Sequence, residues 1–361
     1  MDKARVLVAL SGGVDSSVAA YLAVAGGYEC TGATMRLFDN EDIGAERESS
    51  CCSLADIEDA RTVCKCIGIP YYVFNFTDTF SEQVIDRFIA AYERGWTPNP
   101  CIDCNRFLKF ERFLTRALET GFDYIATGHY ARRQYDENTG RYLLKRGLDR
   151  NKDQSYVLYA MRQEQLAHTL FPLGETTKEQ AREIARSLDF PNADKSESQD
   201  ICFVPDHDYG AFIRRYTGHN YEAGDLVDAE GAYIGSHQGI IDFTVGQRKG
   251  IGIAAAQPLY VTDIISQTAT VVIGEESDLY RQTAIVEDAN LIAHASLEEP
   301  LKATAKHRYR SADKPVTVRQ IGEKELKVVF DEPQKAITCG QALVIYDDDV
   351  VIGGGTIAKA L

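Results

Sequence analysis

The stretch that decides the fold is Arg5-Val6-Leu7-Val8-Ala9-Leu10-Ser11-Gly12-Gly13-Val14-Asp15-Ser16-Ser17. An apolar, strand-like run ends in a Ser-Gly-Gly turn, and a segment with helical spacing of apolar residues follows over 17–25. Two adjacent glycines let the backbone pass close to an anion, and the N–H groups at a helix start point toward it. We therefore predict a phosphate-binding loop between the first strand and the first helix.

This loop differs from two common nucleotide-binding motifs. No Lys follows Gly13, as it would in a triphosphate-hydrolysing loop, and no G-x-G-x-x-G fingerprint is present. Asp15 would suit a Mg²⁺ ion that phosphate oxygens also hold. The octet 10–17 resembles the PP-loop of the ATP pyrophosphatases, and this resemblance implies attack at the α-phosphate, release of pyrophosphate and an adenylated intermediate. The alternative is a plain strand-to-helix turn with Asp15 as a cap.

Short β-branched runs alternate with helical patterns from the start of the chain to about residue 190, which predicts a parallel sheet covered on both faces. The predicted strands are 5–10, 31–37, 71–74 and 124–127, and the predicted helices are 17–25, 54–67, 80–94, 107–119 and 178–188. After about residue 205, strand patterns with glycine turns take over, for example at 259–265, 269–273 and 326–330. We expect an α/β N-terminal domain followed by two smaller β-rich domains, with bounds 1–205, 206–280 and 281–361.

The charge balance limits the partners of this chain. Its 361 residues carry 39 Lys+Arg against 54 Asp+Glu, a net charge of -15, so the protein as a whole should repel a polyanion. Any contact with nucleic acid would need local basic patches. Residues 132–152 hold seven Lys/Arg against three acids, and residues 302–319 hold six against one. Both stretches could also be ordinary solvated faces.

No apolar run approaches the 18 or more residues that span a bilayer, and the N-terminus enters a strand directly without a signal-peptide pattern. We expect a cytoplasmic protein with no membrane partner. Nine cysteines are many for such a chain, and in a reducing compartment they favour buried thiols, metal ligands or reactive thiols over a disulfide framework.

Two cysteines have positions that indicate chemistry. Cys104 lies just ahead of a helix expected from about Arg106, where the helix dipole would lower the pKa of its thiol. Cys202 follows about a hundred residues later, and two such thiols could meet so that one carries a sulfur that the other attacks. Cys101 completes a Cys-x-x-Cys pair, so that Cys101, Cys104 and Cys202 could instead hold an iron–sulfur cluster with one open position.

With these features assembled, the chain closely resembles the bacterial tRNA-specific 2-thiouridylase family over almost its whole length. The motifs that carry the resemblance are Ser11 to Ser17, Met35-Arg36-Leu37, Thr97-Pro98-Asn99-Pro100-Cys101, Cys104-Asn105, Ala126-Thr127-Gly128-His129-Tyr130, Lys152-Asp153-Gln154-Ser155, Ser196 to Phe203, Gly246 to Gly252, Arg308-Tyr309 and Gly353-Gly354-Gly355. The phosphate loop alone would be shared by several synthetase families. The set in this order is specific.

The resemblance implies an N-terminal domain of the PP-loop/HUP type and an ATP-dependent sulfur transfer to C2 of the wobble uridine, U34, in tRNA. The uridine oxygen would be adenylated, and pyrophosphate and then AMP would leave. Cys202 would carry a persulfide sulfur supplied by a cysteine desulfurase or a relay protein. Cys104 would be the second thiol, which either attacks the persulfide to release sulfide or closes a disulfide with Cys202 as AMP departs. Asp15 completes the implied catalytic set. ATP with Mg²⁺ would be held by Ala9, Leu10, Ser11, Gly12, Gly13, Val14, Asp15, Ser16, Met35 and Gly128.

The resemblance also implies contacts with the anticodon loop of tRNA, whose target base would be splayed into the site. The implied tRNA-binding residues are Asn99, Pro100, Cys101, His129, Lys152, Asp153, Gln154, Arg308, Tyr309 and Gln341. Several lie in the two basic stretches that charge alone indicates. In some family members an Asp stands at the position of Cys101, so this thiol need not be essential.

Two other kinds of function remain open at this point. An ATP pyrophosphatase acting on a small molecule would need neither the cysteine pair nor tRNA, so pyrophosphate release with and without tRNA separates it from a thiouridylase. A non-catalytic tRNA-binding or iron–sulfur protein would keep all its activity after Cys202→Ser and would copurify with iron.

Overall fold

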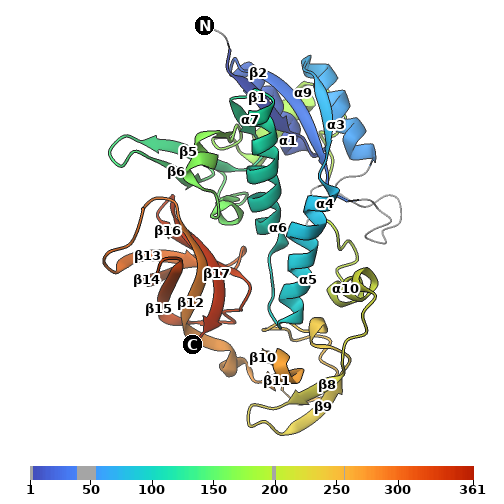
Figure 1. The fold of residues 1–361 in the computed structure, drawn as a ribbon, viewed down its shortest axis with the longest axis vertical. Coiled ribbons are helices and arrows are strands. Elements are labelled where there is room, and N and C mark those ends of the chain that lie inside the picture. The colour runs from blue at the N-terminus through green and yellow to red at the C-terminus, as the bar shows by residue number, and fades with distance from the viewer. Residues whose placement is uncertain (1–2, 39–53, 197–200, 256) are drawn as a thin grey trace. The chain divides into compact units, whose positions relative to one another are not determined.

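The computed structural model describes residues 3–38, 54–196, 201–255 and 257–361 (Figure 1). Cys51, Cys52 and residues 197–200 of the predicted Cys202 motif lie outside the described residues. The chain divides into two compact units. The first comprises Met1–Val84, Cys101–Pro205 and Asp348–Ile352, and the second comprises Ile85–Pro100, Asp206–Asp347 and Gly353–Leu361.

The first unit is built on a five-stranded sheet in the order β3-β2-β1-β4-β7. Its strands are β1 (Arg5–Ala9), β2 (Glu29–Arg36), β3 (Tyr71–Asn75), β4 (Tyr124–Ala126) and β7 (Thr169–Leu170). Every pairing in it is parallel. The predicted parallel sheet is confirmed, and the short strand β7 at its edge is an addition that the sequence pattern did not indicate.

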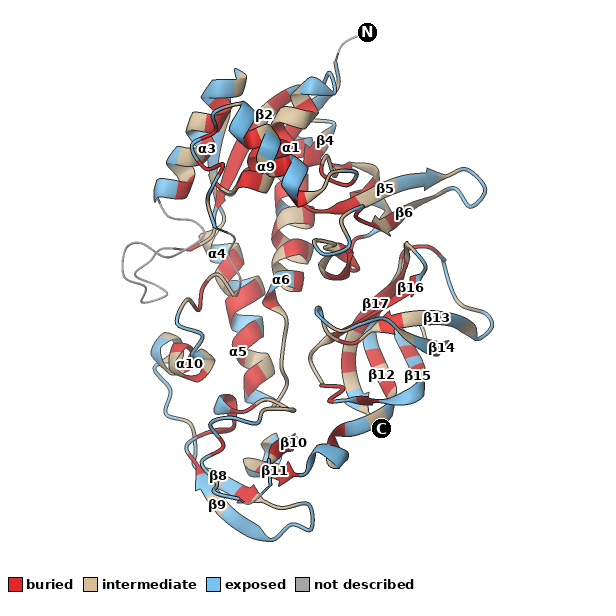
Figure 2. Ribbon diagram, turned by 180° about the vertical axis from the view of Figure 1, so that it is seen from behind, coloured by how far each residue is buried: buried red, intermediate tan, exposed pale blue. Residues whose placement is uncertain are grey.

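Helices cover this sheet on both faces, as buried parallel sheets require. The helices of this unit are α1 (Val14–Ala25), α3 (Leu54–Ile67), α4 (Thr77–Phe80), α6 (Pro100–Asp103), α7 (Leu114–Glu119), α8 (Gln163–Ala167) and α9 (Lys178–Ser187). Val6 and Val8 of β1 pack with Ala20 of α1 and Ala60 of α3 in one core cluster. Leu7, between them in β1, points to the opposite face and is also fully buried. Figure 2 shows buried residues along β2 and α1 of this unit.

Two of the helical runs contain π-helical turns. Residues Ser81–Ile85 join α4 to α5 (Asp86–Glu93), and residues Cys104–Phe113 join α6 to α7. The helical run that contains Cys104 begins at Pro100, earlier than the sequence pattern indicated. Proline suits the first turn of a helix. The prediction that Cys104 lies ahead of the helix is wrong, because Cys104 follows the first turn of this helical run.

The basic stretch 132–152 forms an antiparallel hairpin of β5 (Ala131–Asp136) and β6 (Arg141–Arg146). Three of its cationic side chains bind residues 348 and 349 of the same protein. Arg132 and Arg150 both donate to the carboxylate of Asp349, and Arg146 donates to the backbone carbonyl of Asp348. These contacts hold residues 348 and 349 against the hairpin, while Arg133 donates to the carbonyls of Leu166 and Ala167.

The second unit is rich in β-structure, as predicted. A four-stranded sheet has the order β10-β11-β8-β9, and a further sheet runs β12-β15-β14-β13-β16-β17, with β17 pairing back to β12 as in a barrel. Its strands are β8 (Gly224–Val227), β9 (Tyr233–His237), β10 (Tyr260–Ile265), β11 (Thr270–Gly274), β12 (Tyr280–Leu291), β13 (Leu301–Lys306), β14 (Lys314–Gly322), β15 (Glu325–Lys335), β16 (Ala342–Asp347) and β17 (Val350–Ala360).

One helix of the second unit was not expected from the sequence. It is α10 (Tyr209–Thr217), and its Phe212 and Tyr209 make edge contacts with Phe88 of α5. The helix ends at Gly218 in the left-handed conformation. Across the described residues, no helix is both long and apolar enough to cross a membrane.

Candidate active site

The phosphate loop lies at the carboxyl end of β1, where the order of the sheet reverses. The chain moves from β1 outward to β2 and β3, and then returns to the other side of β1 with β4. In open parallel sheets, ligands bind at such a switch point, in the crevice beyond the strand ends. Residues 10–13 follow β1 there, and residues 127–128 follow β4, so topology places both segments at one site.

The loop is held in shape by its own hydroxyls and by one buried amide. The N–H of Ser11 donates to Ser16 Oγ at 3.2 Å, and the hydroxyls of Ser16 and Ser17 each donate to the carbonyl of Gly13 at 3.0 Å. Asn192 donates from Nδ2 to the Gly12 carbonyl and to Ser17 Oγ, both at 2.9 Å. The sequence pattern gave no indication of Asn192, which lies far along the chain.

Close backbone packing explains two glycines of the site. Gly12 has φ +71°, and a Cβ placed there would lie 2.5 Å from the Asp56 carbonyl oxygen. A Cβ on Gly128 would lie 2.7 Å from the Ser16 nitrogen and 2.8 Å from the Asp15 carbonyl carbon. The loop after β4 therefore rests directly on the start of α1.

Strand β2 also contributes to the candidate site, beside the loops that follow β1 and β4. Thr34 donates from Oγ1 to the Leu10 carbonyl at 2.9 Å and accepts from the Tyr71 hydroxyl at 2.7 Å. Met35 is the next residue, buried near the carboxyl end of β2 and paired in register with Phe74 of β3. The predicted nucleotide-binding residues 9–16, Met35 and Gly128 thus all lie at the carboxyl edge of three adjacent strands.

Asp15 has two partners that the sequence did not reveal. Lys178 Nζ lies 2.8 Å from both carboxylate oxygens, and the Tyr130 hydroxyl donates to Oδ1 at 2.7 Å. Lys178 is the first residue of α9, which Thr177 caps by accepting from the Gln180 N–H. The helix was predicted to start there, but nothing local in the sequence marks its first side chain as part of the loop.

The residues at this loop fit a Mg²⁺ ion only in part. Mg²⁺ is usually bound by one or two carboxylates together with substrate phosphates and water, rather than by a cage of protein ligands. Asp15 offers one carboxylate, and Ser16 and Ser17 offer hydroxyls beside it. In the described residues no group of three or more His, Cys, Asp or Glu side chains is arranged to hold a metal.

Cys104 begins the π-helical stretch, and its surroundings differ from the prediction. The side chain is half-buried, and burial raises the pKa of its thiol, while Lys109 lowers it and Asp103 raises it to a smaller extent. The expected acidic thiol is therefore wrong for this state of the protein. The physical reason is that Cys104 lies inside the helix, where desolvation outweighs the helix dipole.

Cys202 is positioned by the residue after it. Phe203 is buried and packs edge-on against Phe80 of α4, with ring centroids 5.7 Å apart. The same short helix α4 contacts the stretch Cys104–Phe113. The segments that carry the two thiols thus pack against one helix. Neither cysteine is in a disulfide, and both are half-buried.

His129 has a buried side chain. Its Nδ1 lies 2.8 Å from Thr127 Oγ1, and its ring is 5.8 Å from that of Phe110. Burial, and then the nearby charge of Lys109, hold the pKa of His129 well below its usual value. A neutral imidazole can donate one hydrogen bond to a nucleobase or accept one from it. It carries no charge with which to form an ion pair with phosphate.

The loop 152–154 is hydrogen-bonded to Tyr130, which also contacts Asp15. Gln154 accepts from the Tyr130 N–H at 3.1 Å and donates from its own N–H to the Tyr130 carbonyl at 3.0 Å. Asp153 accepts from the N–H groups of Gly147 and Ser155, both at 3.1 Å. The carboxylate of Asp153 therefore shapes this loop, which carries Lys152 at its start.

Of the remaining predicted tRNA-binding residues, Cys101 belongs to the first unit, and the others belong to the second: Asn99, Pro100, Arg308, Tyr309 and Gln341. Arg308 Nη2 donates to Thr338 Oγ1 at 2.8 Å and to the carbonyls of Ala336 and Val245, so its guanidinium bridges parts of this unit. Tyr309, beside it, exposes 37% of its surface. Gln341 donates to the carbonyl of Thr97, which leads into Asn99 and Pro100.

Three segments of the chain match known domain families. Residues 4–206 match the tRNA methyl transferase HUP domain, residues 210–275 the tRNA methyl transferase PRC-barrel domain, and residues 281–357 the Aminomethyltransferase beta-barrel domain. A tRNA-specific 2-thiouridylase MnmA of Clostridioides difficile (strain 630) is 48% identical over 357 residues, which cover 99% of each chain. The MnmA of Carboxydothermus hydrogenoformans is 50% identical over 358 residues, covering 99% of this chain and 98% of the relative.

The chain belongs to the MnmA family of tRNA-specific 2-thiouridylases. Solved structures match smaller parts of it. An NMN synthetase from Francisella tularensis is 19% identical with TM-score 0.34, over 61% of this chain and 79% of that chain. A 4-thiouridine synthetase in an RNA complex with bound ATP is 19% identical with TM-score 0.35, over 56% of this chain and 45% of that chain.

In this MnmA-family chain, Cys101, Cys104 and Cys202 are not gathered as a metal-ligand set within the described residues. Cys101 is exposed on α6, whereas Cys104 is half-buried. The arrangement of these three cysteines in the described residues therefore does not favour an iron–sulfur cluster over a pair of reacting thiols.

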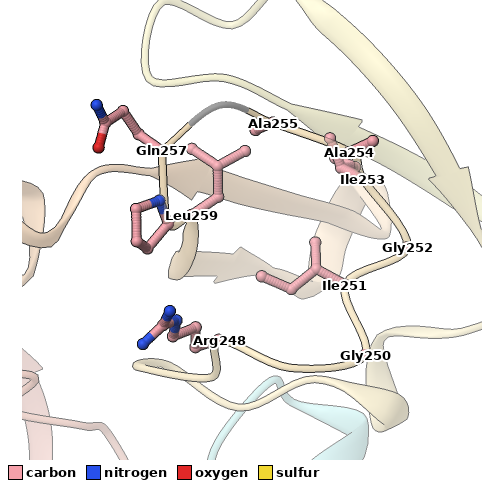
Figure 3. Close-up of a pocket in the computed structure, with 10 residues that line it drawn as sticks. Arg248, Gly250, Ile251, Gly252, Ile253, Ala254, Ala255, Gln257 and Leu259 are labelled. Carbon is pink, nitrogen blue, oxygen red and sulfur yellow. The ribbon is translucent and has the colours of Figure 1, made fainter.

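A cavity of about 430 Å³ lies elsewhere in this MnmA-family chain, in the second unit (Figure 3). Residues 250–255 and 257–259 line most of it, largely with backbone and aliphatic side chains, and Arg248 is its one charged side chain among the labelled residues. It contains none of the predicted catalytic or nucleotide-binding residues. The candidate site described above lies instead at the strand ends of the first unit.

Proposed function

We propose that this protein is a tRNA-uridine 2-sulfurtransferase that uses ATP to convert the wobble uridine U34 into 2-thiouridine, with AMP and pyrophosphate as by-products. The observation that carries this proposal is the phosphate loop at the β1/β4 switch point, together with two thiol segments that pack on the single helix α4. Membership of a family whose relatives are named tRNA-specific 2-thiouridylases supports the substrate.

The first step is activation of the uridine. Its C2 oxygen attacks the α-phosphorus of ATP, the bond to the bridging oxygen breaks, and pyrophosphate leaves with the electron pair. Adenylation is needed because an oxide is a very poor leaving group, whereas AMP is a good one. The N–H groups of the loop and the start of α1 hold the phosphates, and Mg²⁺ bound through Asp15 would supply countercharge.

The second step is sulfur transfer. Cys202 carries a persulfide received from a cysteine desulfurase or a sulfur-relay protein. Its terminal sulfur attacks C2, and Cys104 then attacks the inner sulfur, so that a Cys104–Cys202 disulfide forms as AMP departs. A reductant of the thiol class must reopen this disulfide before the next turnover. A half-buried Cys104 whose thiol has a raised pKa suits a group that reacts only after substrate has entered.

Recognition of the anticodon loop would use both units. Asn99 to Cys101 would approach the target base, and neutral His129 would offer a hydrogen bond rather than a charge. Lys152 to Gln154 would contact the backbone of the loop. Tyr309 offers an exposed ring on which a base can stack, while Arg308 and Gln341 shape the surface around it.

The decisive experiment is nucleoside mass spectrometry of tRNA after incubation with the protein, ATP, Mg²⁺ and a persulfide source. We expect 2-thiouridine at U34, which Cys202→Ser and Cys104→Ser abolish. Cys64→Ser is the matched control, because Cys64 is a buried core thiol beside Gly32 of β2 and has no part in the proposed sulfur transfer. Folded protein that yields no 2-thiouridine on intact tRNA would overturn the proposal.

A parallel assay of pyrophosphate release separates the other functions. A thiouridylase releases pyrophosphate only with tRNA present, and turnover without tRNA on a small metabolite would indicate a synthetase. Iron and acid-labile sulfide that copurify under anaerobic conditions would indicate a cluster at Cys101, Cys104 and Cys202 instead of the persulfide route.

A further inference from the structure

The phosphate loop has no lysine of its own, yet the fold brings one to it. Lys178 lies 163 positions beyond Asp15 in the sequence, and its ammonium is 2.8 Å from both oxygens of that carboxylate. The lysine side chain is only 11% exposed, and the carboxylate 32%. A cation so placed is desolvated enough to interact strongly with an anion that enters the loop.

The backbone at Lys178 is fixed. Its N–H donates to the carboxylate of Asp149 at 3.1 Å, and Thr177 caps the helix that it begins. The other partner of Asp15 is Tyr130, whose hydroxyl holds Oδ1 at 2.7 Å and whose ring is buried. The ammonium is therefore carried on a long side chain from a rigid helix start to a carboxylate that is itself held in place.

Charge balance gives this arrangement a purpose. A carboxylate beside three phosphates is unfavourable unless cations lie between them. Without nucleotide, Lys178 neutralises Asp15. With Mg²⁺ and the triphosphate bound, Asp15 would have a second cation beside it, and the Lys178 ammonium could turn toward the phosphate oxygens while staying close to Asp15.

We propose that Lys178 is a catalytic residue of the nucleotide site, which binds the β- and γ-phosphates of ATP and balances the charge of pyrophosphate as it leaves. No proton moves in this role: the α-phosphorus gains the bond to the uridine oxygen, the bond to the bridging oxygen breaks, and the departing electron pair is stabilised by the ammonium. This inference rests on the proposed function, since it needs ATP as the substrate.

The test compares nucleotides that differ in their phosphates. Binding of ATP, AMP and inorganic pyrophosphate is measured by calorimetry with Mg²⁺ for the wild type, Lys178→Met and Lys178→Arg. We expect Lys178→Met to weaken ATP and pyrophosphate about tenfold or more, with AMP within about twofold, because AMP lacks the two phosphates concerned. Lys178→Arg should retain most of the affinity for ATP.

Arg186→Met is the matched control. Arg186 lies in the same helix and forms its ion pair with Asp194 on the surface, so this variant should bind all three ligands as the wild type does. If Lys178→Met binds ATP normally, or loses AMP and ATP equally, Lys178 is only a structural partner of Asp15 and the proposal is overturned. Wild-type protein that binds no ATP would instead overturn the proposed function.

Thermal unfolding of each variant checks its integrity. Should Lys178→Met fail to fold, Lys178→Gln keeps a polar side chain against Asp15 and removes the charge. The same loss of ATP and pyrophosphate with AMP retained is expected from it, and an equal loss of all three ligands would count against the proposal.

Discussion

Gln341 and Thr97 are joined by a hydrogen bond of 2.8 Å, from the side-chain amide of the first to the backbone carbonyl of the second. The same amide reaches the Pro98 carbonyl at 3.3 Å, and the Thr97 N–H donates to the Cys339 carbonyl at 2.9 Å. The turn before β16 thus holds the segment that leads into Asn99. We infer that Gln341 positions this segment, in addition to any contact with tRNA.

Gln341→Ala should lower the rate of thiolation at limiting tRNA by about twofold to tenfold, the effect of one net hydrogen bond. The cause is a loosened 97–98 segment. Gln282→Ala is the matched control, because Gln282 also joins two backbone carbonyls, those of Phe330 and Asp331, at 2.9 and 3.3 Å. Equal effects of the two variants on thiolation would contradict a positioning role for Gln341.

Gly128→Ala should weaken ATP binding roughly tenfold or more, since overpacking against rigid backbone costs about 1–3 kcal/mol. The new methyl group would lie 2.7 Å from the Ser16 nitrogen, so the start of α1 must shift. Calorimetry measures the affinity. Gly235→Ala provides the comparison, because its Cβ would meet Leu226 at an ordinary 3.5 Å. Unchanged affinity in Gly128→Ala would show that the loop after β4 is free to move.

Alkylation should distinguish the thiols of the resting protein. Iodoacetamide at pH 8 reacts with thiolates, so exposed Cys66 and Cys101 should be labelled first. Cys104 should lag because burial raises its thiol pKa. Cys30 and Cys64, with pKa values raised to about 11 and about 12, should be the slowest. Peptide mass spectrometry follows each site, and Cys104 reacting as fast as Cys101 would refute the buried geometry.

Acid should destabilise the protein through His307. Burial, with help from Arg308 and Lys314, lowers the pKa of His307 to about 4. Its ordinary value is about 6.5, so between these values the unfolded chain binds more protons and stability falls as the pH falls. The largest loss from this one group is about 3 kcal/mol.

The variant His307→Leu removes the titrating group and the unpartnered Nδ1 atom. Urea unfolding at pH 7.5 and pH 4.5 should show a drop in stability about 2 kcal/mol smaller than in the wild type. His219→Asn, at an exposed position, should leave the wild-type difference intact. A pH dependence identical in His307→Leu and wild type would mean that His307 is solvated in the folded state.

Local pattern predicted most of the secondary structure that carries the site. The strands and helices of the parallel sheet were placed within a few residues because apolar periodicity is set by nearest neighbours. The hairpin β5/β6 was missed because half of its strand residues are charged, and their partners lie elsewhere in the sequence: Arg132 binds Asp349, and Arg133 binds the Leu166 and Ala167 carbonyls. The helix containing Cys104 was placed too late, because a π-helical stretch breaks the usual spacing.

The sequence by itself determined the phosphate loop, the order of strands and helices, and the family to which the chain belongs, because each depends on short stretches read in order. Only the tertiary structure decided that Lys178 meets Asp15, that Phe203 anchors the Cys202 segment on α4, and that burial raises the pKa of the Cys104 thiol. These depend on which distant side chains share a low-dielectric interior. Such proximity follows from the packing of whole elements and leaves no mark on local residue spacing.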